Sequence, residues 1–166
     1  HIIGNKMNFA ILSDPVIKNM FSKEEQDIIN SHIPYTRVIN QSLSKSELEK
    51  FIEERNKYVL KIADGASGHE ILIGIECDSE SWCELISEVK MGKRSYVIQE
   101  FVESVPFTYL SNKNQFSKHN LVWGFFVFGE KYAGSVLRTS DKNDRLVINS
   151  YLNKGTKKGY MLELSY

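Results

Sequence analysis

The chain has 166 residues, in which 21 Lys and Arg balance 21 Asp and Glu, so the formal net charge is zero. This length is that of one ordinary domain, or of a piece of one, and is enough to bury a core. Because neither sign is in excess, no overall field favours nucleic acid or an anionic membrane, and an anionic ligand must be held locally. The longest apolar stretch, residues 121–128, is far shorter than the roughly 20 residues that span a bilayer.

The cysteines and the N-terminal residues indicate the cellular compartment in which the protein is expected. Cys77 and Cys83 do not suggest a disulfide framework, and no group of Cys and His has the spacing of zinc ligands. The sequence shows no signal peptide. We therefore expect a protein of the reducing cytoplasm.

The first third of the sequence is typical of helices. Ser22 followed by Glu25, and Ser44 followed by Glu47, each match the capping box, in which serine and glutamate satisfy free N–H groups at a helix start. Apolar residues then repeat at helical spacing after the second box. The segment around 79–91 predicts another amphipathic helix whose apolar face holds Trp82, Leu85, Ile86 and Val89.

The remainder of the sequence is mostly typical of strands. Strands are predicted at 57–62, 70–75, 95–102, 120–128, 131–139 and 146–151. Gly129 and Glu130 predict a tight hairpin turn between two of them. A polar segment at 110–119 interrupts the apolar periodicity and predicts a seam between two lobes. This order of elements predicts an α+β fold with mostly antiparallel sheets and flanking helices.

The segment 58–75, YVLKIADGASGHEILIGI, is the most informative part of the chain. An apolar run ends in Lys61, passes through a loop of small residues that holds Gly65 and Gly68, and enters a second apolar run. Such a loop can place backbone N–H groups and one mobile cation over a polyphosphate. The same composition also forms an ordinary β-turn, so both interpretations stay open.

Two further strands hold candidate ligand-binding groups. In the segment SYVIQEFVES, strand alternation places Gln99 and Glu100 on opposite faces. A strand that ends before Pro106 frees backbone groups of the kind that an adenine edge requires, although an edge strand with solvated acids has the same pattern. Arg138, near a strand end, can bind phosphate or carboxylate through two hydrogen bonds or form a salt bridge at a rim.

A polar turn late in the chain carries oxygen donors. Asp141, Asp144 and Asn149 lie on or near it, and such groups can hold a hard cation. A solvated turn gives the same pattern. His69 lies in the glycine loop, where a hydrogen-bonded role is expected because no serine or cysteine nucleophile pattern accompanies it.

Together these segments resemble a known family. In chain order they resemble the C-terminal part of circularly permuted ATP-grasp proteins, the group that includes glutathionylspermidine synthase-like ligases. The resemblance covers nearly the whole chain and implies a partial ATP-grasp fold over residues 1–166. It implies a helical entry region at 1–56, a nucleotide-clamp lobe at 57–110 and a second β lobe at 119–166. The segments are GNKMNFAILSDP, HIPYTR, YVLKIADGASGHEILIG, YVIQEFVES and WGFFVFGEKYAGSVLRTS.

The resemblance implies that ATP is the cofactor and that Lys6 and Lys61 hold its phosphates. Gly65, Ser67 and Gly68 would belong to the loop that closes over these phosphates.

By the same resemblance, adenine would lie against backbone groups around Phe101 and Glu103, with Gln99 or Glu100 at its edge or near the ribose. Arg138 would have the catalytic role of neutralising the transferred phosphate or an acyl-phosphate intermediate.

The function implied is that of an ATP-dependent carboxylate–amine ligase, which activates a carboxylate as an acyl phosphate before an amine attacks it. In the permuted order of the family, the Glu-x-Asn magnesium motif lies upstream of the segments that match here. We therefore expect most Mg²⁺ ligands in the remainder of the parent chain, and this fragment to be inactive alone. The alternative is a degenerate, non-catalytic ATP-grasp-like module that binds a nucleotide or another protein.

Overall fold

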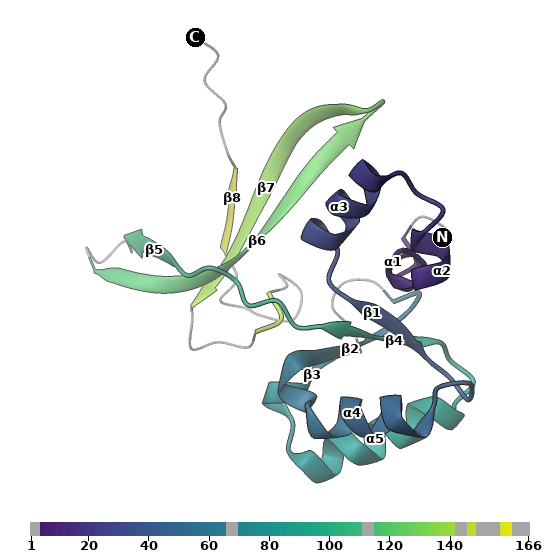
Figure 1. The fold of residues 1–166 in the computed structure, drawn as a ribbon. Helices are drawn as coiled ribbons and strands as arrows, with labels where there is room; N and C mark the ends of the chain where they lie inside the picture. The colour runs from purple at the N-terminus through teal and green to yellow at the C-terminus, as the bar shows by residue number, and fades with distance from the viewer. Residues whose placement is uncertain (1–3, 66–69, 111–114, 142–145, 149–156, 161–166) are drawn as a thin grey trace. The chain divides into compact units, whose positions relative to one another are not determined.

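The computed structural model describes residues 4–65, 70–110, 115–141, 146–148 and 157–160 (Figure 1). The chain divides into two compact units, His1–Val102 and Glu103–Tyr166. The fold is α+β with antiparallel sheets and flanking helices, as the sequence predicts. Among the described residues, no helix combines the length and the apolar character needed to cross a membrane.

Except for the first, the α-helices described in the first unit begin at residues whose side chains cap them. Ser22 and Ser44 each form the predicted capping box, with Glu25 and Glu47 as the reciprocal partners. Asp14 caps a short helix that begins with a proline, a residue whose fixed φ suits the first helical position. The helices are α1 (Met7–Ser13), α2 (Pro15–Lys18), α3 (Lys23–His32), α4 (Lys45–Glu53) and α5 (Ser79–Met91).

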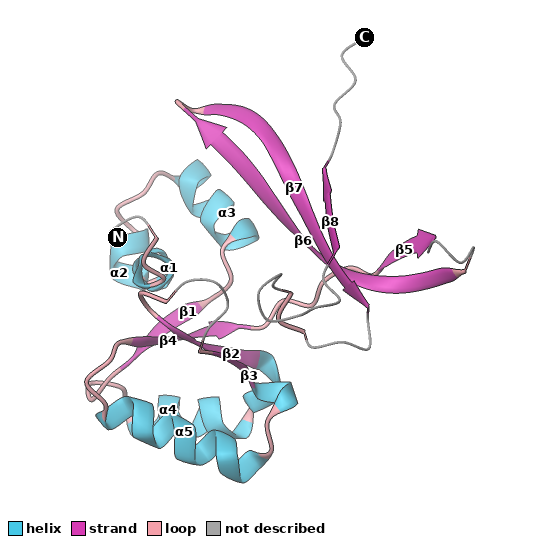
Figure 2. Cartoon of the chain, turned by 180° about the vertical axis from the view of Figure 1, so that it is seen from behind, coloured by secondary structure: helices cyan, strands magenta, loops and turns pink. Residues whose placement is uncertain are grey.

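An antiparallel sheet forms the centre of the first unit. Its strands are β1 (Thr36–Ile39), β2 (Tyr58–Ile62), β3 (Ile71–Ile73) and β4 (Tyr96–Glu100), in the order β1-β4-β2-β3. Helices α4 and α5 cover one face, as both ribbon views show (Figures 1 and 2). Helix α1 packs against β1 and lies on the other side of the sheet.

The main core lies between the sheet and the pair α4 and α5. Phe51 and Trp82 from the helices are fully buried against Leu60 and Ile98 from the strands. The Phe51 ring meets the edge of the Tyr58 ring, with centroids 5.0 Å apart. Because side chains alternate along a strand, the neighbours of Leu60 and Ile98 face away from these helices. Those neighbours include Lys61 and Gln99, the predicted ligand-binding residues.

The second unit is built on a long hairpin. Its sheet has the order β5 (Phe107–Leu110), β6 (Phe116–Phe128), β7 (Lys131–Asp141) and β8 (Lys157–Tyr160), with every pair antiparallel. The hairpin turn is the predicted one, and both its residues have positive φ, 54° at Gly129 and 66° at Glu130. Such a turn matches the right-handed twist of the flanking strands.

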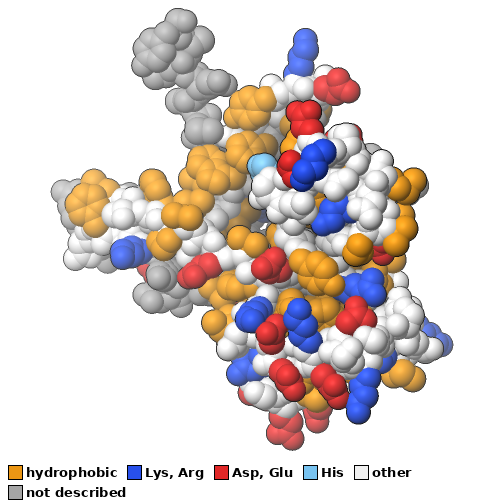
Figure 3. Space-filling view, viewed as in Figure 1, with side chains coloured by type: hydrophobic (Ala, Val, Ile, Leu, Met, Phe, Trp, Pro, Cys, Tyr) orange, Lys and Arg blue, Asp and Glu red, His pale blue; other side chains and the backbone are white. Residues whose placement is uncertain are grey.

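The hairpin exposes many apolar side chains, which appear in orange over the second unit in Figure 3. Trp123 and Phe125 stack with ring centroids 6.2 Å apart, and both are exposed. Across the hairpin, the Phe125 ring also meets the Tyr132 ring, with centroids 6.4 Å apart, so the backbone ladder and such cross-strand contacts hold the hairpin together.

Some predicted elements differ from the structure. The predicted strand 146–151 is wrong at Leu146–Ile148, which form no strand, and residues 149–151 lie outside the described part. The apolar run Leu146–Ile148 has no place beside β7, because β6 and β8 occupy both edges of that strand. The strand predicted at 70–75 is shorter, since a 3₁₀-helix, Gly74–Glu76, follows β3.

The structure also holds elements that the sequence analysis did not predict one by one. The helices α1 and α2 lie within the region predicted as helical, whereas β1, β5 and β8 are strands that were not predicted. All but one of these are only four residues long, so their hydrophobic periodicity is too short to read. The seam predicted at 110–119 lies inside the second unit, and its residues 111–114 lie outside the described part. The division between units falls instead between Val102 and Glu103.

Candidate functional site

Two lysines from distant parts of the chain meet on the face of the first sheet opposite α4 and α5. The backbone N–H of Lys6 donates to the Ala63 carbonyl at 2.8 Å, which fixes the entry to α1 beside the end of β2. The Lys6 ammonium donates to the Gly65 carbonyl at 2.5 Å. The Lys61 ammonium, from β2, donates to Gln99 Oε1 at 2.5 Å.

Lys6 and Lys61 are two positive charges in a partly buried environment. Burial lowers the pKa of Lys61, and the nearby positive charge of Lys6 lowers it further. Burial also lowers the pKa of Lys6, while Asp64 acts in the opposite direction. Within the described residues, neither ammonium forms a salt bridge. A bound anion would remove both the desolvation penalty and the mutual repulsion.

Gln99 is buried beside Lys61 and is part of a longer polar chain. Its Nε2 donates to Thr36 Oγ1 at 2.8 Å, and the Thr36 hydroxyl donates to the Pro34 carbonyl at 2.9 Å. Sequence reasoning missed Thr36, because nothing local shows that β1 lies beside β4. The register places Thr36 opposite Gln99.

Some of the backbone groups predicted to bind adenine already form hydrogen bonds within the first unit. The Phe101 N–H donates to the Lys57 carbonyl at 2.8 Å, and the Glu100 N–H donates to the Tyr35 carbonyl at 2.8 Å. An adenine that accepted a hydrogen bond from the Phe101 amide would have to displace Lys57. The Glu100 side chain is exposed. Glu103 is exposed as well and belongs to the second unit.

The loop residues of the predicted site are described only at one end. Gly65 supplies the carbonyl that Lys6 contacts, whereas Ser67 and Gly68 lie outside the described residues.

Arg138 belongs to the second unit, in the middle of its sheet. It lies in β7 opposite Val122 of β6 and Lys158 of β8. Its Nε and the hydroxyl of Ser140 are buried without a hydrogen-bond partner in the described part of the chain. Because Arg138 and Ser140 are two positions apart in β7, strand alternation places them on one face of the sheet. The same spacing could have identified Ser140 as a candidate from the sequence. Unsatisfied buried polar atoms are rare and call for a ligand or water.

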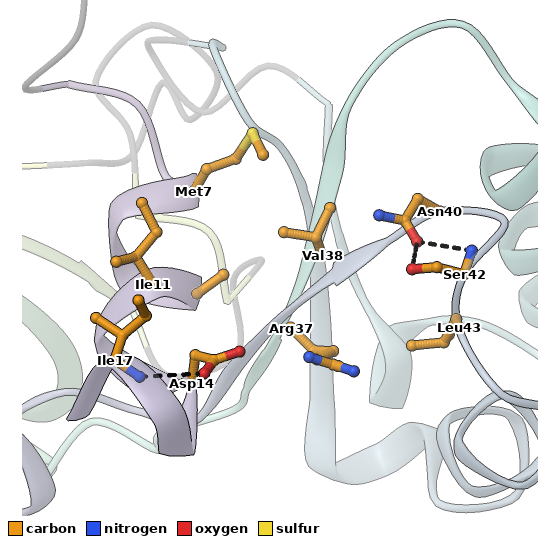
Figure 4. Close-up of a pocket in the computed structure, with 10 residues that line it drawn as sticks. Met7, Ile11, Asp14, Ile17, Arg37, Val38, Asn40, Ser42 and Leu43 are labelled. Atoms are coloured by element: carbon orange, nitrogen blue, oxygen red, sulfur yellow. Dashed lines mark hydrogen bonds between the residues drawn. The ribbon is translucent and has the colours of Figure 1, made fainter. Parts of the chain in front are cut away.

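A separate pocket in the first unit does not include the lysine pair. It has a volume of about 240 Å³ and lies between α1 and α2 on one side and β1 on the other (Figure 4). Its polar groups already support local structure. Asp14 caps α2, Asn40 accepts from Ser42, and Arg37 pairs with Glu47 at 3.1 Å. The pocket therefore lacks a polar group aimed at a ligand.

Comparison with known proteins found no family model that matches this chain, and no match among curated proteins. Among the described residues, no three His, Cys, Asp or Glu side chains come together as a group that would hold a metal ion.

Proposed function

We propose that the first unit binds the polyphosphate of ATP through Lys6 and Lys61, and that the chain is the nucleotide-binding part of a carboxylate–amine ligase of the circularly permuted ATP-grasp type. Two lines support the proposal. The order of the sequence motifs resembles that family. The single observation that carries it is the backbone hydrogen bond from Lys6 to Ala63, which brings Lys6 beside the end of β2, the strand that holds Lys61.

The groups around the lysines suit a polyanion. Both ammonium groups donate to neutral oxygens, those of Gly65 and Gln99, so neither hydrogen bond cancels the positive charge, although the Asp64 carboxylate also acts on Lys6. An ammonium that exchanges such a partner for a phosphate oxygen gains a charge-assisted hydrogen bond. Each of these bonds contributes about 1.5–3 kcal/mol. We therefore expect the two lysines to bind neighbouring phosphates of one nucleotide.

In the proposed reaction, a carboxylate oxygen attacks the γ-phosphorus of ATP and ADP leaves, which gives an acyl phosphate. An amine then attacks the acyl carbon and inorganic phosphate leaves, so that an amide forms. The part of Lys6 and Lys61 is to hold the phosphates and to stabilise the charge that develops on them. Magnesium would add charge neutralisation, but the described residues do not fit a magnesium site. We assign its ligands to the remainder of the parent chain.

The test is calorimetric titration of the chain with a non-hydrolysable ATP analogue. Lys6→Met and Lys61→Met should each weaken binding roughly 10- to 150-fold, the equivalent of one charged hydrogen bond. Lys45→Met is the matched control, because Lys45 is an exposed lysine on α4 whose ion pair with Glu49 is also at the surface. Its affinity should equal that of the wild type.

Two outcomes would overturn the proposal. One is a wild-type chain that does not bind the analogue, and the other is equal affinity in the wild type and both site variants. An ADP-formation assay with magnesium and candidate acids and amines should show no turnover, because the resemblance places the magnesium ligands of the family outside this chain. The triplet Glu54-Arg55-Asn56 does not supply them, since Glu54 pairs with Lys57 and Asn56 Oδ1 accepts from Arg55. Turnover that disappears in Lys61→Met would instead place a complete active site on this chain.

A further inference from the structure

The hydrogen bonds around Lys61 have a fixed direction. A proline carbonyl only accepts, so the single hydroxyl proton of Thr36 is used in its bond to Pro34. Thr36 Oγ1 must then accept from Gln99, which turns the amide nitrogen of Gln99 toward Thr36. The amide oxygen of Gln99 consequently faces Lys61. The position of the acceptor for Lys61 is therefore set by β1, two strands away from β2.

Thr36 is itself held from both sides. Its backbone N–H donates to Ser13 Oγ at 3.0 Å, and the Ser13 hydroxyl donates to the Phe9 carbonyl at 2.8 Å. Helix α1 begins directly after Lys6, so the same helix that carries one lysine supports the polar chain that orients the other.

Burying the polar side chains of Thr36 and Gln99 costs free energy that apolar side chains would not cost. Gln99 is 7% exposed and Thr36 is 1% exposed. The neighbours on the same face are apolar, since Val59 and Val97 are both buried. An aliphatic residue at either position would need no hydrogen bonds at all. Among the described residues, the charged side chain that accompanies these polar groups is that of Lys61, which donates to Gln99.

We propose that Gln99, locked by Thr36, is a positioning residue that holds the Lys61 ammonium without neutralising it, so that the lysine pair prefers a triphosphate to a monophosphate. This inference rests on the proposed nucleotide binding. A glutamate in the same place would hold Lys61 equally well but would cancel one of the two charges. The neutral amide leaves the charge of Lys61 for the ligand, next to that of Lys6, and a ligand with several charged phosphates gains most from that.

The first experiment compares affinity for the ATP analogue and for AMP. Gln99→Glu should weaken analogue binding about 10- to 100-fold and reduce the preference for it over AMP. Gln99→Met removes the acceptor but adds no charge, so it should weaken binding less and keep the preference. Thr36→Val should resemble Gln99→Met, and Thr36→Ser should restore wild-type binding. Gln41→Glu makes the same chemical change on an exposed turn and should have no effect.

The second experiment needs no nucleotide. Reductive methylation with ¹³C-formaldehyde labels the lysines, and NMR titration then follows the pKa of Lys61, whose signal is identified by its absence in Lys61→Met. The carboxylate of Gln99→Glu should raise this pKa above its wild-type value, whereas Gln99→Met and Gln41→Glu should not raise it. Loss of the acceptor in Gln99→Met should lower the pKa of Lys61, and an unchanged pKa in that variant would show that Gln99 does not hold the ammonium.

The outcomes separate the two proposals. If the wild type does not bind nucleotide but Gln99→Glu raises the pKa of Lys61, the positioning role stands and the nucleotide assignment fails. If the wild type binds nucleotide and Gln99→Glu keeps the affinity and the preference for triphosphate, the positioning role is wrong. If Gln99→Glu does not fold, the nucleotide affinities of Gln99→Met and Thr36→Val test the inference instead. Unchanged affinity in both would overturn the inference, and a loss that Thr36→Ser reverses would support it.

Discussion

Replacing Trp82 by phenylalanine tests the core that supports the lysine pair. Trp82 is 0% exposed, and its indole N–H donates to the Phe51 carbonyl at 3.0 Å. Phe51 lies in the last turn of α4, where carbonyl groups lack a partner within the helix. The indole therefore acts as a capping group that joins α5 to the end of α4.

The expected cost follows from these contacts. Phenylalanine keeps an aromatic ring in the core but leaves the Phe51 carbonyl buried and unpaired, at about 1–3 kcal/mol. The smaller ring also leaves a void, which adds about 1 kcal/mol. We expect the free energy of unfolding of the first unit to fall by about 2–4 kcal/mol. For a unit of this size, that lowers Tm by roughly 10–25 °C.

The chain offers a matched control in its other tryptophan. Trp123 lies on β6 of the second unit and is 41% exposed, so Trp123→Phe should change stability by less than about 0.5 kcal/mol. Far-ultraviolet circular dichroism during urea and thermal unfolding measures both variants. Each variant keeps one tryptophan, so fluorescence reports on the second unit in Trp82→Phe and on the first in Trp123→Phe. Equal destabilisation by the two substitutions, or none by Trp82→Phe, would refute the assigned capping role.

Three further predictions concern the same unit. Ser44→Ala removes the capping box of α4, in which the Glu47 N–H donates to the serine hydroxyl at 3.2 Å, and should cost about 0.5–2 kcal/mol in urea unfolding. Gly74→Ala should cost at least about 3 kcal/mol and prevent normal expression, because its Cβ would lie 1.9 Å from the Arg55 carbonyl oxygen; wild-type stability would contradict the placement of Gly74–Glu76. Folding lowers the pKa of Lys61 from its ordinary value of 10.5. At a pH between the lowered pKa and 10.5, the unfolded chain therefore binds more protons than the folded chain. The free energy of unfolding should rise with pH in this range. Urea unfolding at increasing alkaline pH should show a smaller rise in Lys61→Met, and an identical rise would contradict the burial of this ammonium.

Several features could be predicted from the sequence because they depend on residues that are close together in the chain. The capping boxes at Ser22 and Ser44 involve residues three positions apart, so the pattern and the hydrogen bonds lie in one short segment. The turn at Gly129 and Glu130 likewise depends on two adjacent residues that tolerate positive φ. Helix α5 was readable because its apolar side chains repeat over thirteen residues, which is long enough for a clear period.

Strand pairing was decided by tertiary structure. Residues 146–148 are apolar and were expected in a strand, whereas Lys157–Tyr160 gave no such signal. A strand forms only where another strand has a free edge, and β8 takes the edge of β7 that β6 leaves open. Hydrophobicity describes the face that a segment can bury, but it does not say which edge the segment reaches.

The candidate site shows the same limit. The sequence, through a family resemblance, singled out Lys6, Lys61 and Gln99, and strand alternation separated Gln99 from Glu100. Thr36 and the direction of its hydrogen bonds were not readable, because they depend on the register between β1 and β4. Residue types and their local spacing determine which charges the chain can offer. Only the packing of distant strands decides which neutral partner each charge meets, and therefore whether that charge is left for a ligand.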